Sequence, residues 1–429
     1  MRVVHLSLSD NRGGAACAAY RIHQALLADN IDSRMFVRIK ASTDEAVEPY
    51  QPAKDFWSRL KRVRRRIGVV RRVSRYHKTR PPGPFIFHAR SSELGRDLMG
   101  DLPEADLLNL HWVSTFVDFA AFFRAVGGRV PVVWTLHDMN PFTGGCHYST
   151  GCDGYLRQCG RCPWLGSDNP RDLSHKTWRR KKRALQRVPT DMLHIVSPSR
   201  WLGEQAKASS LFGRFPVHVL PNCLDTDVFE PRDRLVATQA LDIPADAKVV
   251  LFAAANPEMP RKGFNLLVEA IGRVDESDRP MLLTLGQGSP TVSDTLAHKH
   301  VGAIHDERLL TLIYSAADVL ACPSLEDNLP NTVLESMACG TPAVGFNVGG
   351  IGDMVRPDST GLLAPAGDTG ALSEAVRSLL SDPDRLGRMG RESREVAVRE
   401  YSQKAGARRY AELYKDMQSG RGSGQAIGK

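Results

Sequence analysis

The sequence predicts an α/β protein made of two domains, each with a parallel sheet covered by helices. At 429 residues the chain is longer than one hydrophobic core usually serves, and two domains of about 200 residues fit its length. Short apolar runs alternate along the chain with amphipathic segments of helical spacing, which is the pattern of strands joined by helical crossovers. A hydrophobic content of 42% is enough for two cores.

The apolar runs give the expected strands, which lie at residues 3–8, 107–110, 130–136, 193–196, 249–254, 281–285, 319–322 and 343–346. The clearest expected helices cover residues 16–29, 263–274, 307–317 and 371–380. A stretch rich in Pro and Asp at 221–231 separates two such series. We therefore predict an N-terminal domain over residues 1–222 and a C-terminal domain over 223–400. The Gly- and Ser-rich end of the chain predicts a disordered tail over 418–429.

No apolar run approaches the length of a membrane span. The first residues turn polar too soon for a signal peptide and instead predict a buried strand. We therefore expect a cytoplasmic protein.

The most informative stretch covers residues 323–342, where a polar loop runs into a helix that Gly340 and Pro342 end. Glu326 and Asp327 precede this helix and Glu335 lies inside it. A helix N-terminus offers free N–H groups to a diphosphate, and a carboxylate further along can accept hydrogen bonds from sugar hydroxyls. This arrangement suits a nucleotide sugar, although acidic residues are also common at ordinary helix starts.

The neighbouring motifs decide between these two interpretations. Residues 282–394 resemble the C-terminal domain of family 4 glycosyltransferases, a large retaining family with the GT-B fold. The matching motifs, in order, are residues 285–288, 314–319, 323–324, 334–342, 348–355 and 361–365. The resemblance implies two Rossmann-like domains whose parallel sheets face each other across a cleft. It also implies that a final helix, at 401–417, crosses back to the N-terminal domain.

The resemblance assigns roles to individual residues. The family has two acids in its donor motif; Glu335 fits the second position and Asp327 the first, with Glu326 just before it. Catalytic roles are expected for His111, Asp327 and Glu335. Donor-binding roles are expected for Gly13, Gly14, Arg261, Lys262, Glu326, Asn328, Leu329, Pro330, Asn331 and Glu335.

The cations and glycines in this set have a physical reason. Arg261 and Lys262 follow an expected strand and precede a helix, where they can neutralise a leaving diphosphate without a metal. Gly13 and Gly14 follow the first expected strand, and glycines there let backbone N–H groups approach a phosphate. The alternative interpretation of Arg261 and Lys262 is a solvated basic pair, and that of Gly13 and Gly14 is an ordinary turn.

Two histidines end expected strands, which is where ligands of open α/β sheets bind. By resemblance, His111 lies near the reacting sugar, while His137 and Asp138 shape the acceptor side. Retaining enzymes of this fold are described with the leaving phosphate taking the acceptor proton, so we name no general base. The segment that contains Asp225 and Asp227 resembles the turn between the two domains of the family, so we do not assign a metal to these acids. We expect no cofactor or metal in catalysis.

Four cysteines cluster in residues 138–165, namely Cys146, Cys152, Cys159 and Cys162. In a cytosolic protein such a cluster suggests a structural zinc site, with His147 as an alternative ligand. Free thiols and a disulfide are the other interpretations. This segment resembles an insertion on the acceptor side of some bacterial exopolysaccharide enzymes.

A basic segment at residues 54–80 carries twelve Lys and Arg residues against one acid, with apolar residues at near-helical spacing. This pattern is typical of a helix that binds an anionic membrane surface, here the inner leaflet of the plasma membrane, and residues 176–183 add to the same basic face. A solvated helix packed on the domain is the alternative. Nucleic-acid binding would explain the charge but not the motifs of residues 282–394, so we exclude it.

Together these features predict a retaining hexosyltransferase. We expect it to move a hexose from a nucleotide-sugar donor to a glycan acceptor, a lipid-linked oligosaccharide, during exopolysaccharide or lipopolysaccharide synthesis. The alternatives with the same architecture are a sugar-nucleotide epimerase and a weak or non-catalytic scaffold subunit of a polysaccharide assembly complex.

Overall fold

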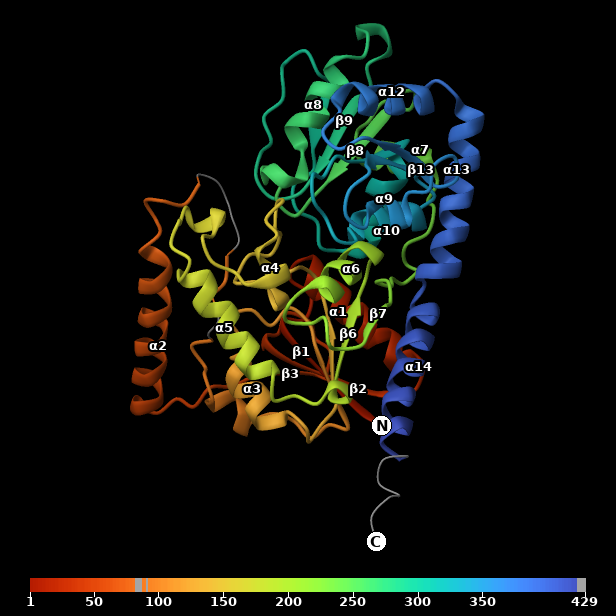
Figure 1. Ribbon diagram of the computed structural model, residues 1–429. Coiled ribbons are helices and arrows are strands. Elements are labelled where there is room, and N and C mark those ends of the chain that lie inside the picture. The colour runs from red at the N-terminus through yellow and green to blue at the C-terminus, as the bar shows by residue number, and fades with distance from the viewer. Residues whose placement is uncertain (82–86, 90–91, 423–429) are drawn as a thin grey trace. The chain divides into compact units, whose positions relative to one another are not determined.

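The computed structural model describes residues 1–81, 87–89 and 92–422, and it divides the chain into two compact units. The first, here called the N-unit, joins Met1–Pro221 with the C-terminal segment that begins at Ala407. The second, the C-unit, is Asn222–Gly406. Both units are parallel-sheet α/β structures (Figure 1), so the predicted fold class is confirmed.

The N-unit contains a seven-stranded sheet in the order β3-β2-β1-β4-β5-β6-β7, and every printed strand pair is parallel. From β1 the chain builds outward to β3 and then returns to the other side of β1 with β4. The carboxyl ends of β1 and β4 therefore form the switch point where ligands of open α/β sheets bind. The strands are β1 (Arg2–Ser9), β2 (Asp32–Ile39), β3 (Val47–Pro49), β4 (Leu107–Leu110), β5 (Val132–Thr135), β6 (Leu193–Ser197) and β7 (Val217–Val219).

Helices cover this sheet, and most begin at a side chain that caps free N–H groups. Asp118, Asp172 and Ser199 cap α3, α5 and α6 in this way. Large aromatic side chains, among them Trp134 and Phe122, fill the core beneath them. The helices are α1 (Gly14–Ala28), α2 (Phe56–Ser74), α3 (Phe119–Val126), α4 (Gly154–Arg157), α5 (Leu173–Leu185), α6 (Arg200–Ala208) and α14 (Gln403–Gly422).

Helix α14 belongs to the N-unit for most of its length because its tyrosines reach the sheet. The Asn109 side chain on β4 donates to the Tyr414 hydroxyl (2.9 Å), and the hydroxyls of Tyr410 and Thr135 lie 3.3 Å apart. The helix continues to Gly422, so the predicted disordered tail was wrong for residues 418–422. The rest of that tail, residues 423–429, lies outside the described residues.

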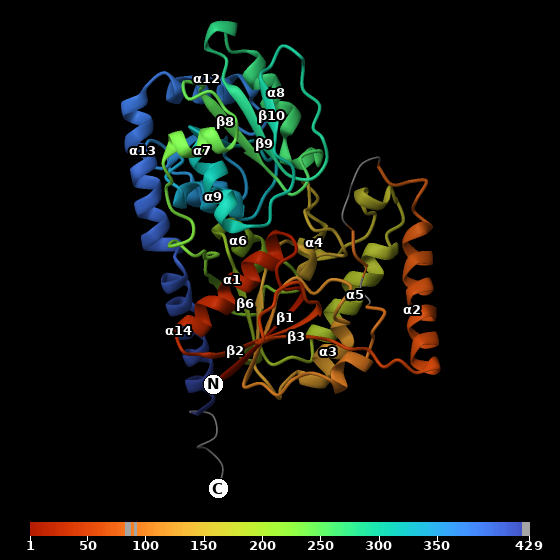
Figure 2. The ribbon, with the colours of Figure 1, turned by 180° about the vertical axis from the view of Figure 1, so that it is seen from behind.

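The C-unit contains a six-stranded parallel sheet in the order β10-β9-β8-β11-β12-β13. Its helices lie on both faces of the sheet (Figures 1 and 2), with one hydrophobic cluster under each layer. The strands are β8 (Val249–Ala253), β9 (Met281–Leu285), β10 (His298–His300), β11 (Val319–Cys322), β12 (Ala343–Phe346) and β13 (Gly361–Ala364). The helices are α7 (Arg234–Ala240), α8 (Phe264–Gly272), α9 (Glu307–Ala316), α10 (Asn331–Ala338), α11 (Ile351–Met354), α12 (Thr369–Leu380) and α13 (Pro383–Val396).

The C-unit repeats the switch-point topology. The chain leaves β8 toward β9 and β10 on one side, and then crosses to β11 on the other side. The loops after β8 and β11 therefore diverge at the middle of the sheet, which is the place where this architecture binds ligands. Among the described residues, no helix has the length and apolar character needed to cross a bilayer.

Candidate functional site

In the C-unit, the loops after β8 and β11 bring the predicted donor-binding residues together. Arg261 and Lys262 follow β8, and Asp327 follows β11. The two loops touch at Gly263, whose φ is +71°; a Cβ atom there would lie 1.9 Å from the Pro323 carbonyl oxygen. Only glycine fits this approach and this backbone conformation. The Leu325 N–H also donates to the Arg261 carbonyl (2.8 Å), which fixes the two loops to each other.

Asp327 lies at the centre of this cluster. Its Oδ2 accepts from the Lys262 Nζ (2.5 Å) and the Ser324 hydroxyl (3.3 Å), and its Oδ1 lies 3.6 Å from the Arg261 guanidinium. Burial opposes ionisation of this carboxyl, but the positive charges of Lys262 and Arg261 outweigh burial and hold its pKa below the ordinary value. Asp327 is therefore an anion that keeps both cations in place.

Helix α10 begins directly after this cluster, at Asn331. Glu335 lies one turn inside it, is 7% exposed, and accepts from the Tyr314 hydroxyl (2.7 Å). At the start of the helix the Asn331 side-chain oxygen accepts from the Asn222 amide (3.0 Å). The other predicted donor-binding residues, Glu326, Asn328, Leu329 and Pro330, form the short loop between β11 and α10.

A third loop, which follows β12, completes this region and was missed by the sequence analysis. The Gly350 N–H donates to the Asp327 carbonyl (3.1 Å). A Cβ at Gly349, where φ is +56°, would lie 1.8 Å from that same carbonyl oxygen. The Gly-Gly pair in residues 348–355 could have indicated this close approach, since glycine is what permits it.

In the N-unit, Gly13 and Gly14 lie where the loop after β1 becomes helix α1. Gly13 has a φ of +89° and precedes the first helical residue, and no atom of the described residues lies within 4 Å of a Cβ built on it. The loop is held by Asp10, which is fully buried and accepts from the N–H groups of Asn11, Ala41 and Ser42. Asp10 was not predicted; it orients the glycine loop without itself facing solvent.

His111 and His137 line a small hollow together with Trp112, Ser114, Asp138 and Asn140. His111 directly follows β4 and is 1% exposed. Both of its ring nitrogens are hydrogen-bonded, Nε2 to His5 (2.9 Å) and Nδ1 to His137 (3.1 Å). Contact between the His111 ring nitrogens and a sugar would require one of these bonds to break. The predicted role of His111 stays a prediction.

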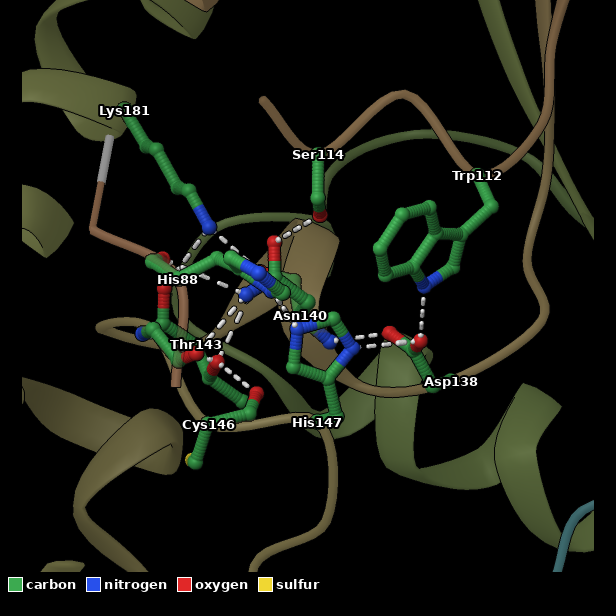
Figure 3. Close-up of polar contacts among 10 residues, drawn as sticks. His88, Trp112, Ser114, Asp138, Asn140, Thr143, Cys146, His147 and Lys181 are labelled. Atoms are coloured by element: carbon green, nitrogen blue, oxygen red, sulfur yellow. Dashed lines mark hydrogen bonds and ion pairs between the residues drawn. The ribbon is translucent and has the colours of Figure 1, made fainter. Parts of the chain in front are cut away.

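Asp138 is held by a dense set of donors (Figure 3). Its Oδ2 accepts from the Trp112 indole N–H (2.8 Å) and lies 2.6 Å from the His147 Nδ1, while its Oδ1 accepts from the Asn140 N–H (2.8 Å). Burial opposes ionisation of Asp138, yet His147 and these hydrogen bonds lower its pKa. The His147 Nε2 lies 2.8 Å from the His88 Nδ1. Asp138 therefore positions the pocket wall, and His147 ties the cysteine-rich segment to it.

The Lys181 side chain on α5 reaches the segment that contains Asn140 and Thr143 (Figure 3). It is 2% exposed and donates to the carbonyl oxygens of Asn140 and Thr143. Burial lowers its pKa to about 8. The prediction that residues 176–183 add to a basic surface is therefore wrong for Lys181, because its charge points into the N-unit.

The four clustered cysteines line one cavity with Phe87, Tyr155 and Trp164. All four are free, and burial raises the pKa of the Cys146, Cys159 and Cys162 thiols. Within residues 1–81, 87–89 and 92–422, no three His, Cys, Asp or Glu side chains stand where they could hold a metal ion. Zinc binding would thus need the thiols to turn toward one another.

The basic segment forms α2, whose first turn is capped by Asp55. None of its residues is buried. The helix lies at the outside of the N-unit, beside α5 (Figures 1 and 2). Its exposed apolar side chains are Phe56, Trp57, Leu60, Val63, Ile67 and Val70. The helix also packs on the N-unit, as the alternative interpretation expects: Arg65 donates to the Leu94 carbonyl (2.7 Å) and pairs with Asp97 (2.8 Å), and Val73 contacts the hydrophobic cluster that contains Leu165.

Comparison with known proteins supports this architecture. The family model described as Glycosyltransferase Family 4 matches residues 12–228, and the one described as Glycosyl transferases group 1 matches residues 247–382. D-inositol 3-phosphate glycosyltransferase of Xylanimonas cellulosilytica is 31% identical over 199 residues, which is 43% of this chain and 47% of that protein. The chain thus spans about half the length of this curated relative.

Solved structures match nearly the whole chain. Sucrose-phosphate synthase of Thermosynechococcus elongatus superposes with a TM-score of 0.67 at 19% identity, over 98% of this chain and 99% of that one. Anabaena HepE, solved in complex with UDP-glucose, superposes with a TM-score of 0.63 at 16% identity, over 97% of this chain and 100% of that one. At these identities the similarity shows the fold alone, and it confirms the predicted GT-B architecture.

Proposed function

The chain belongs to glycosyltransferase family 4, and we propose that it is a retaining hexosyltransferase that uses a nucleotide-sugar donor. The observation that carries this proposal is the cluster of Arg261, Lys262 and Asp327 at the switch point of the C-unit, directly before helix α10. Breaking a sugar–diphosphate bond leaves negative charge on the diphosphate. Fixed cations and helix N–H groups stabilise that charge without a metal.

Asp327 gives the two cations a defined place before the donor binds. The side chains of Lys262 and Arg261 keep 20% and 27% of their exposure, so a diphosphate can reach them. Glu335 lies one turn into α10, where its carboxylate can accept from the ribose hydroxyls. HepE was solved with UDP-glucose, which makes UDP-glucose the first donor to test.

The acceptor binds, in this proposal, at the N-unit hollow beside His137, Trp112 and Asp138. The acceptor hydroxyl gives its proton to the leaving diphosphate on the same face of the sugar, so no side chain acts as general base. The product is a glycan lengthened by one hexose, with retained anomeric configuration.

A lipid-linked acceptor at an anionic membrane surface is the finer part of the proposal, and α2 supports it. Its apolar residues are exposed, and twelve basic residues surround them in the segment 54–80. Anionic headgroups attract such a segment while apolar side chains enter the interface. This location places the enzyme beside lipid-linked precursors of a surface polysaccharide.

A structural zinc ion in the cysteine-rich segment remains a separate proposal. Four free thiols that line one cavity support it, because tetrahedral thiolate sites are typical of structural zinc. In this role zinc would brace the segment that carries His147 and would take no part in transfer.

The experiment is a transfer assay with a panel of nucleotide sugars, a bacterial lipid extract as acceptor, and EDTA present. Labelled sugar in the lipid fraction, lost in Lys262→Met but kept in the surface variant Arg273→Met, is the expected result. Arg273 pairs with exposed Glu269 on α8 (2.9 Å), and its replacement by Met removes one cation outside the cluster. Conversion of the donor without an acceptor would instead indicate an epimerase, and no turnover or binding of any donor would indicate a scaffold.

A further inference from the structure

A buried cation lies beside the four clustered cysteines of the N-unit. Lys181 on α5 is 2% exposed, and its Nζ donates to the carbonyl oxygens of Asn140 and Thr143 (Figure 3). The same Nζ lies 4.9 Å from the centre of the Phe119 ring. These partners are neutral, and within the part of the chain that the structure describes Lys181 forms no ion pair with a carboxylate. Buried charges in proteins are normally paired, so this cation needs an anion.

The cysteines are the groups that can supply this anion. Among the groups that can become negative, Cys159 and Cys146 interact most strongly with the Lys181 charge, and Asp138 follows. Asp138 already lies within hydrogen-bond distance of three other groups. The Cys146 thiol also interacts electrostatically with the other three thiols of the cavity. A thiol is neutral and a thiolate is negative, so the Lys181 ammonium favours thiolates in this cluster.

One peptide group links the cation to a sulfur atom. The Thr143 carbonyl accepts from the Lys181 Nζ (3.1 Å), and the N–H of the same peptide, which belongs to Gly144, donates to the Cys159 Sγ (3.1 Å). The negative end of this peptide dipole thus faces the ammonium, and its positive end faces the sulfur. Hydrogen bonds in series polarise one another, and an N–H donor favours the charged form of the sulfur. A Cβ at Gly144 would lie 2.8 Å from the Cys159 Cβ, so glycine permits this approach.

We propose that Lys181 is the buried counter-charge of a metal-bound tetrathiolate formed by Cys146, Cys152, Cys159 and Cys162. This inference rests on the zinc site proposed above and is independent of sugar transfer. The four thiols give their protons to solvent as they bind Zn²⁺, so the centre carries net negative charge, and Lys181 offsets part of it. The thiols must turn toward one another as they bind, because among the described residues they do not stand in a coordinating arrangement.

The buried cation distinguishes this site from the two other interpretations of the cysteines. Protonated thiols are neutral and so is a disulfide, and either state leaves the Lys181 ammonium with neutral partners. A tetrathiolate supplies the missing anion.

His147 is not a ligand in this proposal. Its Nδ1 lies 2.6 Å from the Asp138 Oδ2, and its Nε2 lies 2.8 Å from the His88 Nδ1. A ligating histidine needs a bare ring nitrogen that faces the metal, and both nitrogens of His147 already have partners. The ligand set is therefore the four cysteines alone.

The first experiment counts metal ions and thiolate ligands in the full-length wild type. Protein loaded with zinc should hold about one zinc ion per chain. Co²⁺ in its place should give the sulfur-to-cobalt charge-transfer absorption of a site with four thiolates. Absorption typical of three thiolates would overturn the ligand set, and uptake of neither metal would overturn the proposal together with the zinc site. These measurements need no variant to fold.

The second experiment measures what the Lys181 charge contributes to zinc affinity, by competition with a chelator of known affinity. Lys181→Met should weaken zinc binding about 10–100-fold, as is typical when a group just outside the ligands is lost. Lys181→Gln keeps N–H donors for the two carbonyls but has no charge, and it should weaken binding by a similar factor. The control is Lys176→Met, which removes an exposed cation from the same helix and should leave zinc affinity unchanged.

Two results would overturn the role of Lys181 and leave the zinc site intact. The first is wild-type zinc affinity in folded Lys181→Met. The second is wild-type affinity in Lys181→Gln, because hydrogen bonds and not charge would then explain any loss in Lys181→Met. If Lys181→Met does not fold, Lys181→Gln decides between charge and no effect. None of these readouts uses sugar transfer, so a chain that turns over no donor leaves them intact.

Discussion

Replacing Asp327 with asparagine tests whether this carboxylate holds the two cations of the C-unit. The Asp327 side chain is 8% exposed and forms an ion pair with the Lys262 Nζ at 2.5 Å, with Arg261 slightly farther away. Asparagine keeps the size and a polar oxygen but removes the charge. Lys262 and Arg261 would then remain near each other without an anion.

The size of the effect follows from burial. Removal of one partner from a fully buried pair costs about 3–5 kcal/mol. The side chains of Lys262 and Arg261 are 20% and 27% exposed, so water replaces part of the lost interaction. We therefore expect Asp327→Asn to lower the free energy of unfolding by about 2 kcal/mol, which is typical of a hydrogen bond to a charged group. For a unit of this size that loss lowers Tm by roughly 4–8 °C.

The pH dependence has a defined sign. The folded-state pKa of Asp327 lies below its ordinary value of 3.8. The pair therefore stabilises the folded C-unit above about pH 4, and this stability is lost as the pH falls through the folded-state pKa. Asp327→Asn should lose this acid-dependent contribution, so the stabilities of the two proteins should converge below that pH.

Calorimetry and titration with UDP are the assays. Because Asp327 competes with a diphosphate for Lys262 and Arg261, Asp327→Asn should bind UDP at least as tightly as the wild type, even though it is less stable. Asp384→Asn, an exposed acid in the first turn of α13, is the control and should change neither quantity. Unchanged stability in Asp327→Asn, or UDP binding as weak as in Lys262→Met, would refute the reasoning.

Three further predictions concern the loop, the surface helix and the thiols. Gly263→Ala should lower the free energy of unfolding, measured by chemical denaturation, by more than about 2 kcal/mol, because a Cβ would meet the Pro323 carbonyl at a positive φ. Gly272→Ala is the control, because no atom of the described residues lies within 4 Å of a Cβ there, and its stability should stay within about 1 kcal/mol of wild type. Trp57→Glu should abolish flotation with anionic vesicles at low salt without a change in Tm, since Trp57 is 68% exposed; flotation equal to wild type would contradict the membrane role of α2. Purified protein should contain about one zinc per chain by elemental analysis, reduced in Cys159→Ser; zinc-free protein with full stability would end the zinc proposal.

Much of the fold could be predicted because buried parallel strands are continuous apolar runs. The central strands β1, β4, β8 and β11 were predicted near their observed bounds. In contrast, β2 was not predicted, because Asp32, Arg34 and Arg38 interrupt its apolar residues. Edge strands such as β3 and β10 are only three residues long and leave little pattern to find.

Side-chain environments were harder to predict from the sequence. Lys181 lies among other basic residues on α5, and only the folded structure shows that its side chain is buried in the N-unit. His5 looks like one polar residue in a buried strand, yet it contacts a histidine that lies far away in the sequence. Tertiary pairing of this kind has no local signal. The positions of Arg261, Lys262 and Asp327 beside expected helices indicated a phosphate site, and the family motifs favoured that interpretation over ordinary surface charge.

The central claim is that the C-unit cluster binds a nucleotide sugar, and ligand-dependent thermal stability of the full chain tests it most directly. UDP, GDP, ADP and their sugar conjugates are screened against wild type, Lys262→Met and the control Arg273→Met. A ligand at a hundred times its Kd adds about 2.7 kcal/mol of stability. We predict such a shift with one nucleotide family in the wild type and the control, and its loss in Lys262→Met. No shift with any nucleotide, or an equal shift in Lys262→Met, would contradict the account.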